Sequence, residues 1–335
     1  MDNKPCLFDY AASELSQDAF FAWLLANADA SGVEEVHDLS RLFLRKAFEM
    51  NNVSFPKDFS IYVERQYRNI DVFAVIDVND NGKYAVILED KIHTVDHDNQ
   101  LKRYREEIEK EGKYCQVVCL YCKTGDQSNH KSVDEAGYAY FDRRLILDLM
   151  DTPEGRHAVE TNAIVRDFVA HLNTMENLVS QYRNISIGDW KWNDWKGFFM
   201  ALQREESKRD GNWDYVSNPS GGFMGFWWHW YPIENNQAYV YLQLEEGKAC
   251  FKVECGELDA YELKWKWHEK IIKTAQAKGI GARKPNVMRK GYWMTVAVLD
   301  TEYRVATPEG KLDFQKTLDK LHEMELVLDA AVAEQ

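Results

Sequence analysis

The spacing of apolar residues in the first half of the chain predicts alternating helices and strands. Apolar positions recur at helical spacing over residues 12–28 and 37–50, and residues 60–78 read as one long strand or two in succession. Asn79-Asp80-Asn81-Gly82 is a tight-turn sequence, so Tyr84–Ile92 is expected to return as the second strand of an antiparallel hairpin. Helices are then expected at 97–111, 142–150 and 160–181, and strands at 115–122 and 137–141. This order predicts an α/β fold in which a mixed sheet is flanked by helices.

The chain changes character after Gln181. Nine of the 11 tryptophans lie between Trp190 and Trp267. Strands are expected at 222–232, 237–245, 248–255 and 291–299, and helices at 259–278 and 309–332. Because 335 residues exceed the usual size of a single domain, we predict two domains. Residues 1–182 form the first, and residues 183–335 form a Trp-rich α+β domain that recognises a substrate or a partner.

The composition is that of a globular protein, with 45% hydrophobic and 13% aromatic residues. No apolar run approaches the roughly 18–20 residues that span a bilayer. The N-terminal segment is charged and lacks the basic-then-apolar order of a signal peptide. We therefore expect a soluble, cytoplasmic protein without a membrane partner, and a homo-oligomer stays possible.

Three charged residues follow directly on a buried strand. The five apolar or aromatic residues Tyr84–Leu88 predict a strand that is buried on both faces, and Glu89, Asp90 and Lys91 come next. Side chains alternate along a strand, so Glu89 and Lys91 share one face and Asp90 points to the other. Asp71, a single acid within an apolar run, is expected at the same end of the hairpin because it lies far from the turn. Two carboxylates and an ammonium group then converge.

This combination suits the hydrolysis of a phosphodiester. Two carboxylates can hold one or two Mg²⁺ ions, which prefer oxygen ligands. Such a metal polarises the scissile phosphate and lowers the pKa of an attacking water. A lysine can orient that water and offset the developing negative charge. In the alternative interpretation, Glu89-Asp90-Lys91 is a strand that runs out into solvent with ordinary surface ion pairs.

The same residues carry a family resemblance. Ile70-Asp71 followed by Glu89-Asp90-Lys91 resembles the signature of the PD-(D/E)xK, or restriction-endonuclease-like, nuclease superfamily, although Ile70 stands where the name has Pro. A bacterial subgroup is similar in further pieces, namely Glu14 in an early helix, Glu89-Asp90-Lys91-Ile92, and Gln100-Leu101-Lys102-Arg103-Tyr104. The resemblance covers about residues 10–175. It implies a restriction-endonuclease-like mixed sheet with flanking helices, and a second C-terminal α+β domain follows it.

The resemblance also implies roles for the individual residues. The expected catalytic residues are Asp71, Glu89, Lys91 and Gln100. The expected ligands of Mg²⁺ or Mn²⁺ are Asp71, Glu89, Asp90 and Glu14. A helix cap would account for Glu14 equally well, and a helix surface for Gln100. The predicted function is metal-dependent hydrolysis of DNA phosphodiesters, in defence or repair. The alternative is a catalytically inactive nuclease-fold module that senses nucleic acid or a protein.

The net charge of −14 is unfavourable for a protein that binds nucleic acid, but the charge is unevenly distributed. Residues 263–292 carry nine Lys and Arg against one acid, Glu269. Local basic patches rather than total charge drive phosphate binding, and interleaved aromatics suit stacking on bases. The candidate nucleic-acid contacts are Lys264, Lys266, Lys270, Arg283, Lys284, Arg289 and Lys290. In the alternative, Trp265 and Trp267 belong to the core, and the alternation of Lys and Trp favours buried rings and exposed lysines.

Overall fold

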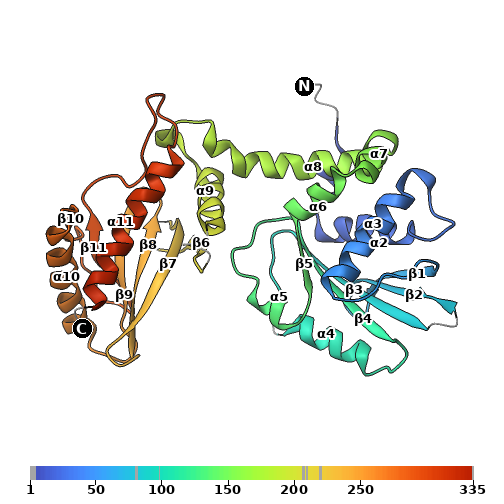
Figure 1. Cartoon of the computed structure of the whole chain (residues 1–335), viewed down its shortest axis with the longest axis horizontal. Helices are drawn as coiled ribbons and strands as arrows, with labels where there is room; N and C mark the ends of the chain where they lie inside the picture. The colour runs from blue at the N-terminus through green and yellow to red at the C-terminus, as the bar shows by residue number, and fades with distance from the viewer. Residues whose placement is uncertain are drawn as a thin grey trace. The chain divides into compact units, whose positions relative to one another are not determined.

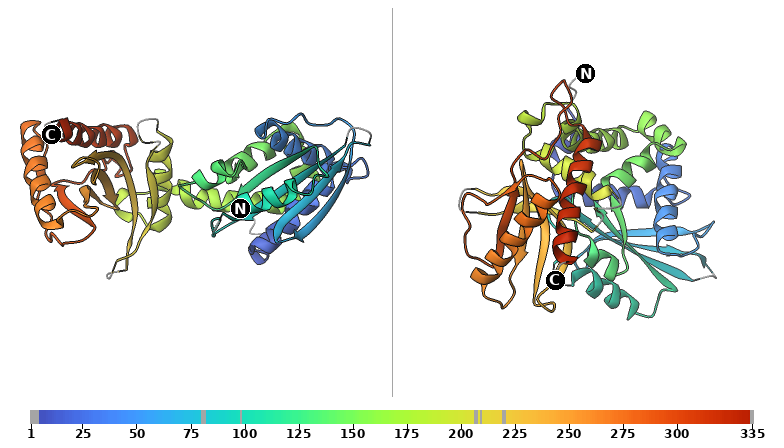
Figure 2. Two further views of the ribbon diagram at one scale, coloured as in Figure 1. Left: turned by 90° about the horizontal axis from the view of Figure 1, so that it is seen from below. Right: turned by 60° about the vertical axis from the view of Figure 1, so that its left-hand side comes forward.

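The computed structural model describes residues 5–79, 82–97, 99–205, 208, 210–218 and 221–333. The chain divides into two compact units, residues 1–176 and 177–335. Figure 1 labels their elements, and Figure 2 gives two further views with the first unit in blue to green and the second in yellow to red. Within the described ranges, no helix combines the length and the apolar character needed to cross a membrane.

The N-terminal unit is built on a five-stranded sheet in the order β1-β2-β3-β4-β5. β1, β2 and β3 pair antiparallel, whereas β4 runs parallel to β3 and β5 parallel to β4. The parallel steps follow from the crossover helices α4 and α5, which separate these strands in the chain. The strands are β1 Ser60–Tyr67, β2 Ile70–Asp77, β3 Lys83–Lys91, β4 Gln116–Lys123 and β5 Ala139–Asp142.

Helices cover both faces of this sheet, so its central strands are buried on both sides (Figure 1). One core joins α2, α3, α6, α7 and α8 to the sheet, and the other joins α4 and α5 to its opposite face. The predicted mixed sheet with flanking helices is thus confirmed. The helices are α1 Leu7–Tyr10, α2 Glu14–Ala26, α3 Glu34–Met50, α4 Gln100–Glu109, α5 Lys131–Glu135, α6 Arg143–Met150, α7 Pro153–Thr161 and α8 Ala163–Ser180.

The elements depart from the sequence prediction where local turns intervene. The stretch 60–78 splits into two strands because Arg68 and Asn69 both have positive φ, the conformation that a tight hairpin turn needs. The helix expected from residue 160 begins at Ala163, and a separate helix, α7, precedes it with Thr152 as its N-cap. Asp80 and Asn81 of the predicted hairpin turn lie outside the described residues.

The C-terminal unit contains a six-stranded antiparallel sheet in the order β10-β11-β9-β8-β7-β6. Three helices pack against it, and this confirms the predicted α+β architecture. The prediction lacked α9, β6 and β10. The elements are α9 Trp192–Arg204, β6 Asn212–Val216, β7 Phe223–Ile233, β8 Ala238–Glu245, β9 Lys248–Glu254, α10 Ala260–Ala277, β10 Ala282–Arg283, β11 Trp293–Leu299 and α11 Phe314–Ala333.

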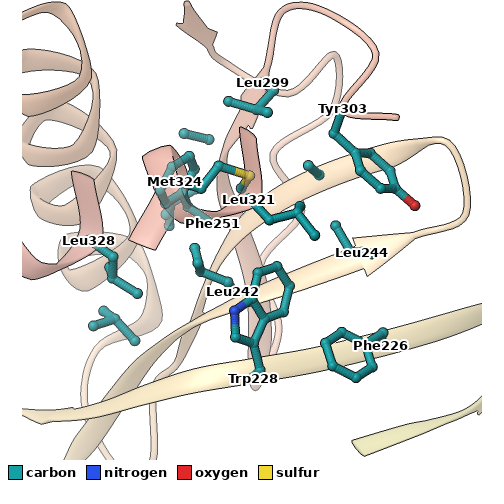
Figure 3. Packing of buried hydrophobic residues seen from close by; sticks show 14 of the residues in the cluster. Phe226, Trp228, Leu242, Leu244, Phe251, Leu299, Tyr303, Leu321, Met324 and Leu328 are labelled. Carbon is teal, nitrogen blue, oxygen red and sulfur yellow. The ribbon is translucent and has the colours of Figure 1, made fainter. Parts of the chain in front are cut away.

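Much of the aromatic content of this unit lies in its core. Figure 3 shows Trp228 beside Phe226 and Leu242, with Met324 and Leu328 of α11 opposite. The indole Nε1 of Trp228 donates to Glu325 Oε1 over 2.6 Å, so the ring is buried without an unsatisfied donor. These residues face the helices, and alternate residues of the same strands point to the other side of the sheet.

Candidate active site

Strand pairing brings Asp71 and Glu89 together at one end of the N-terminal sheet. Val72 of β2 pairs with Leu88 of β3, so the next residue outward on each strand faces its counterpart. Cross-strand partners share one face of a sheet, and their Cβ atoms lie about 5 Å apart. Asp71 Oδ2 also accepts a hydrogen bond of 2.9 Å from the backbone N–H of Asp90. The expected convergence of the two carboxylates is therefore present in the structure.

Lys91 lies between these carboxylates. Its Nζ is 2.5 Å from Glu89 Oε1 and 3.3 Å from Asp71 Oδ2, and it donates to the carbonyl of Asp90 over 3.1 Å. Burial alone would lower the pKa of Lys91, but the adjacent Glu89 and Asp71 raise it well above its ordinary value. The ammonium group is therefore charged and held at the strand end. The interpretation of Glu89-Asp90-Lys91 as a solvent-exposed strand is wrong, because all three side chains are buried.

Glu89 is fully buried and is oriented by the following helix. Gln100 begins α4, and its Nε2 donates to Glu89 Oε1 over 2.7 Å and to the Tyr104 hydroxyl over 3.1 Å. Burial and the neighbouring Asp71 carboxylate raise the pKa of Glu89 to about 8. Gln100 is therefore more than a helix-surface residue, because its side chain links Tyr104 of α4 to the carboxyl group of Glu89 at the end of β3.

Glu14 organises the chain just beyond β3. Its Oε1 accepts hydrogen bonds from the backbone N–H of Ile92 over 2.9 Å and from the Thr94 hydroxyl over 2.8 Å. Burial would raise the pKa of Glu14, yet the hydrogen bonds from Ile92 and Thr94 hold it below its ordinary value. The geometry thus gives Glu14 a structural role at the end of the strand, on the first turn of α2.

Asp90 belongs to the opposite side of the sheet. Its Oδ1 accepts a 2.6 Å hydrogen bond from Gln17 Nε2 of α2, and Gln17 Oε1 in turn accepts from the Thr124 hydroxyl over 2.8 Å. Burial raises the pKa of Asp90 well above its ordinary value. Strand alternation turns the Asp90 carboxyl toward α2 and away from Glu89, and its Oδ2 is buried without a hydrogen-bond partner among the described residues. The assignment of Asp90 as a metal ligand stays a prediction.

Asp18 is a site residue that sequence reasoning missed. It lies on α2 one turn after Glu14, is 1% exposed, and shares Gln66 with Asp71. Gln66 Nε2 is 3.2 Å from Asp18 Oδ2 and 3.4 Å from Asp71 Oδ1. Burial and the Asp71 charge raise the pKa of Asp18 to about 6. A possible signal was the polar pair Gln17 and Asp18, which falls on the buried, otherwise apolar face of the helix.

A second buried lysine flanks the site on the next strand. Lys123 of β4 is in register with Lys91, is 1% exposed, and its Nζ donates to the carbonyl of Thr94. Burial lowers the pKa of Lys123 to about 8. The loop that follows β4 is held by Arg143, which donates to the carbonyl of Thr124 and pairs with Asp126 over 2.6 Å. These contacts fix the strand ends around the carboxylates.

Comparison with known families identifies the family of the N-terminal part of the chain. The sequence model of the PD-(D/E)XK nuclease superfamily matches residues 7–186, more than half of the chain. The chain belongs to the PD-(D/E)XK nuclease superfamily. The match covers β2, β3 and α4, which supply the strand-end carboxylates and Gln100. No curated protein and no solved structure matches the chain.

The strand-end residues of this PD-(D/E)XK protein fit a divalent cation by their donor chemistry. Glu89 Oε2 and Asp18 Oδ1 are buried, and within the described residues neither has a hydrogen-bond partner. A buried carboxylate oxygen without a partner is unfavourable, and a hard cation would satisfy it. No three His, Cys, Asp or Glu side chains in the described part of the chain form a complete metal cage. Mg²⁺ is commonly bound by one or two carboxylates with water and phosphate oxygens.

The basic residues predicted to contact nucleic acid fall into two groups. Lys264 is 5% exposed, and its Nζ donates to the carbonyl of Met288 over 3.3 Å, so its assignment as a phosphate contact is wrong. It lies on the buried face of α10 together with Trp267 and Ile271, because helical rather than alternating spacing applies there. The other candidates lie nearer the surface. Lys266 forms an ion pair with Glu234, and Lys270 and Lys284 lie over the rings of Trp267 and Trp265, respectively. The remaining three, Arg283, Arg289 and Lys290, are exposed.

The raised pKa of Glu89 predicts how stability depends on pH in the metal-free protein. Between about pH 4.5 and 8 the folded state holds a proton on Glu89 that the unfolded state has released. The free energy of unfolding should therefore fall as pH rises through this window, by at most about 1.4 kcal/mol per pH unit from this group.

Urea unfolding at pH 5, 6.5 and 8 in EDTA measures this slope. Glu89→Gln should flatten the slope, whereas Glu160→Gln, at an exposed position on α7, should keep it. An unchanged slope in Glu89→Gln would contradict the titration assigned to this carboxyl.

Proposed function

We propose that this protein is a metal-dependent nuclease that hydrolyses DNA phosphodiester bonds, in the defence or repair setting that the family resemblance implies. The observation that carries the proposal is the arrangement at one strand end, where Asp71 and Glu89 face each other with Lys91 between them. Membership of a superfamily of nucleases supports the same reaction.

In this proposal, Asp71 and Glu89 hold Mg²⁺ or Mn²⁺. The bound ion would supply Lewis-acid polarisation of the phosphate and a lowered pKa for the attacking water. Gln100 keeps Glu89 in its orientation through Oε1, and Oε2, which has no hydrogen-bond partner among the described residues, would be available to bind the ion. Glu14 keeps the segment after β3 in place through Ile92 and Thr94, and so supports the metal pair from outside it.

Lys91 acts on the reacting phosphate in this proposal. Its ammonium group remains protonated, so it serves as a hydrogen-bond donor and a positive charge rather than as a base. When water attacks phosphorus and the P–O ester bond breaks, negative charge grows on the phosphoryl oxygens. A preorganised cation in a water-poor site stabilises that charge more than it stabilises the substrate. The attacking water gives up a proton to solvent, and the leaving oxygen takes one from solvent, so the step is balanced.

The two parts of the chain have different tasks in this account. We assign cleavage to a domain of residues 1–182 and recognition of the substrate to the Trp-rich domain of residues 183–335. Residues 177–335 carry 21 Lys and Arg against 23 Asp and Glu, so most of the net negative charge falls in the carboxylate-rich first unit. The segment with Arg283, Lys284, Arg289 and Lys290 is the proposed phosphate contact of the second.

A second candidate function is a catalytically inactive module that keeps the nuclease fold and senses nucleic acid or a protein. The observation that favours it is Lys91 itself, which already binds the carboxyl groups of Asp71 and Glu89 without a metal. A buried ion pair of this kind can serve specificity of the fold alone. Metal binding separates the two functions, because an inactive module has no need of a divalent ion.

Cleavage of labelled linear, circular and single-stranded DNA, and of RNA, tests the proposal. The wild type should cleave DNA with Mg²⁺ or Mn²⁺ and lose all activity in EDTA. Asp71→Asn should lose cleavage, whereas Asp77→Asn, at the other end of the same strand, should keep it. No cleavage of any substrate by the wild type would favour the inactive module, and equal activity in Asp71→Asn would place the active site elsewhere.

A further inference from the structure

The sheet of the C-terminal unit has a second face that points away from its helices. On β8 and β9, Val240, Leu242 and Phe251 belong to the core with α9, α10 and α11. Residues of the opposite parity point to the other side of the sheet. On this open face three large aromatic residues are accessible to solvent: Trp293 is 63% exposed, and Trp230 and Tyr239 are each 38% exposed.

A strained backbone position puts Trp230 on this face. Trp228 belongs to the core, so in a regular strand Trp230 would point the same way. The register of β7 with β8 instead shifts between Trp228 and Tyr231, and His229 adopts a φ of 61°. Such a conformation is unfavourable for a residue other than glycine, and bulges of this kind re-aim side chains near functional sites. His229 is held on the helix side by Asp329, 2.6 Å from its Nε2.

The aromatic rings of the open face are held in fixed orientations. Trp230 stacks on Tyr241 with ring centroids 3.8 Å apart and an interplanar angle of 9°. Tyr239 is in register with Glu254 on the next strand, and Glu254 with Trp293 on the strand after that. Trp293 donates its Nε1 to Glu254 Oε2 over 3.2 Å. The rings therefore form a row across the four strands β7, β8, β9 and β11, in which β9 contributes Glu254 in place of a ring. Neighbouring strands lie about 4.8 Å apart.

A basic segment adjoins this row. Residues 283–292 contain four Lys and Arg and no acid, and the segment leads directly into Trp293. Arg283, Pro285, Asn286 and Val287 of this segment line a pocket of about 460 Å³ together with Thr295, which belongs to the open face. Thr295 accepts a hydrogen bond from Lys252, the neighbour of Tyr241 on β9.

Three acids line the same pocket, and two of them are already paired. The third, Asp300, lines the pocket together with Lys248 and Arg283. Glu245 binds Lys252 over 3.2 Å, and Glu302 binds Arg304 over 2.8 Å. Their negative charge is therefore largely offset within the protein. The segment's own four cations are all exposed and then dominate the charge presented beside the aromatic row.

We propose that this open face, defined by Trp230, Tyr239, Tyr241 and Trp293, binds single-stranded nucleic acid by stacking its bases on the aromatic row. The basic segment 283–290 holds the phosphate backbone alongside. Unpaired bases present π-faces to such rings, whereas a duplex keeps its base faces stacked inside. The proposal rests on the proposed function in one respect, namely that the substrate of this protein is a nucleic acid. It adds that the C-terminal unit recognises this nucleic acid in its single-stranded form.

Fluorescence anisotropy with a labelled single strand of mixed sequence, and with its duplex, tests the proposal on the full chain in EDTA. The wild type should bind the single strand more tightly than the duplex. Trp293→Ala and Trp230→Ala should each weaken single-strand binding by about 5- to 150-fold, the effect of losing one stacked base. Trp192→Ala, at another exposed tryptophan of the same unit, should bind like the wild type.

Several results would overturn the proposal. The proposal fails if the wild type binds neither the single strand nor the duplex, or if it prefers the duplex. It also fails if Trp293→Ala, shown to be folded by circular dichroism, binds the single strand as tightly as the wild type does. The outcome is independent of cleavage, because EDTA removes the metal. If Trp293→Ala binds normally while the wild type still cuts DNA, the stacking surface is refuted and the proposed function stands. If binding follows the prediction but no substrate is cut, the proposed function fails and the stacking surface stands.

Discussion

Replacing Lys91 by methionine is expected to lower metal-dependent DNA cleavage by about 100- to 1,000-fold, the effect of removing one preorganised charge from a transition state. Methionine has a similar length and no charge, so packing at the strand end changes little. The variant keeps Asp71 and Glu89, and Mn²⁺ binding should therefore survive. Single-turnover cleavage at saturating Mn²⁺ measures the loss.

Lys83→Met is the matched control for this prediction. Lys83 lies at the other end of β3 and pairs with Asp77 beside the hairpin turn, so its loss should leave cleavage unchanged. Thermal melting in Mn²⁺ shows whether Lys91→Met remains folded at the assay temperature. A folded Lys91→Met variant with wild-type cleavage would contradict the role assigned to this lysine.

Replacing Trp228 by alanine is expected to lower the free energy of unfolding of the C-terminal unit by about 3–5 kcal/mol. Trp228 is 1% exposed, lies at the centre of the packing in Figure 3, and its loss removes the hydrogen bond to Glu325. Residues 177–335 have a core of their own, so the effect should be confined to that unit.

Differential scanning calorimetry with unit-specific hydrogen exchange measures this second effect. Trp228→Ala should lose protection in β7, β8 and α11, while β2 and β3 keep theirs. Trp192→Ala provides a tryptophan substitution at an exposed site, where little change is expected. Equal loss of protection in both units would contradict the assignment of separate cores and the two-domain proposal that rests on it.

The core of the candidate site could be predicted from the sequence because its geometry is local. Only five residues, 78–82, separate β2 from β3 in the chain, which limits the register of the pair, and strand alternation then places Asp71, Glu89 and Lys91 on one face. The same alternation predicts that Asp90 points away. What occupies that far side could not be predicted, because Gln17 reaches Asp90 only through packing of α2 against the sheet.

Other parts of the site depend on contacts between residues far apart in the chain. Asp18 and Gln66 are separated by 48 residues, and nothing in either segment alone indicates that they meet. Lys264 was misplaced for a different reason. Alternation along Lys264-Trp265-Lys266-Trp267 is a strand argument, whereas this stretch is helical and buries residues three and four apart.

The bulge at His229 is a further feature without a sequence signal. A run of aromatic residues from Phe226 to Tyr231 fits a buried strand of either register, and only the backbone decides which tryptophan faces solvent. Residues at positive φ outside glycine carry local strain, and such positions concentrate at functional sites. The open aromatic face could therefore be recognised only once the strand pairing was known.

Calorimetric titration of Mn²⁺ into the wild type and Asp71→Asn at pH 8 measures the proposed metal site without any assumption about the substrate. We expect saturable binding to the wild type, a loss of affinity of more than about tenfold in Asp71→Asn, and wild-type binding in Asp77→Asn. Equal Mn²⁺ affinity in Asp71→Asn and the wild type, or no binding to the wild type at all, would contradict a metal site between Asp71 and Glu89.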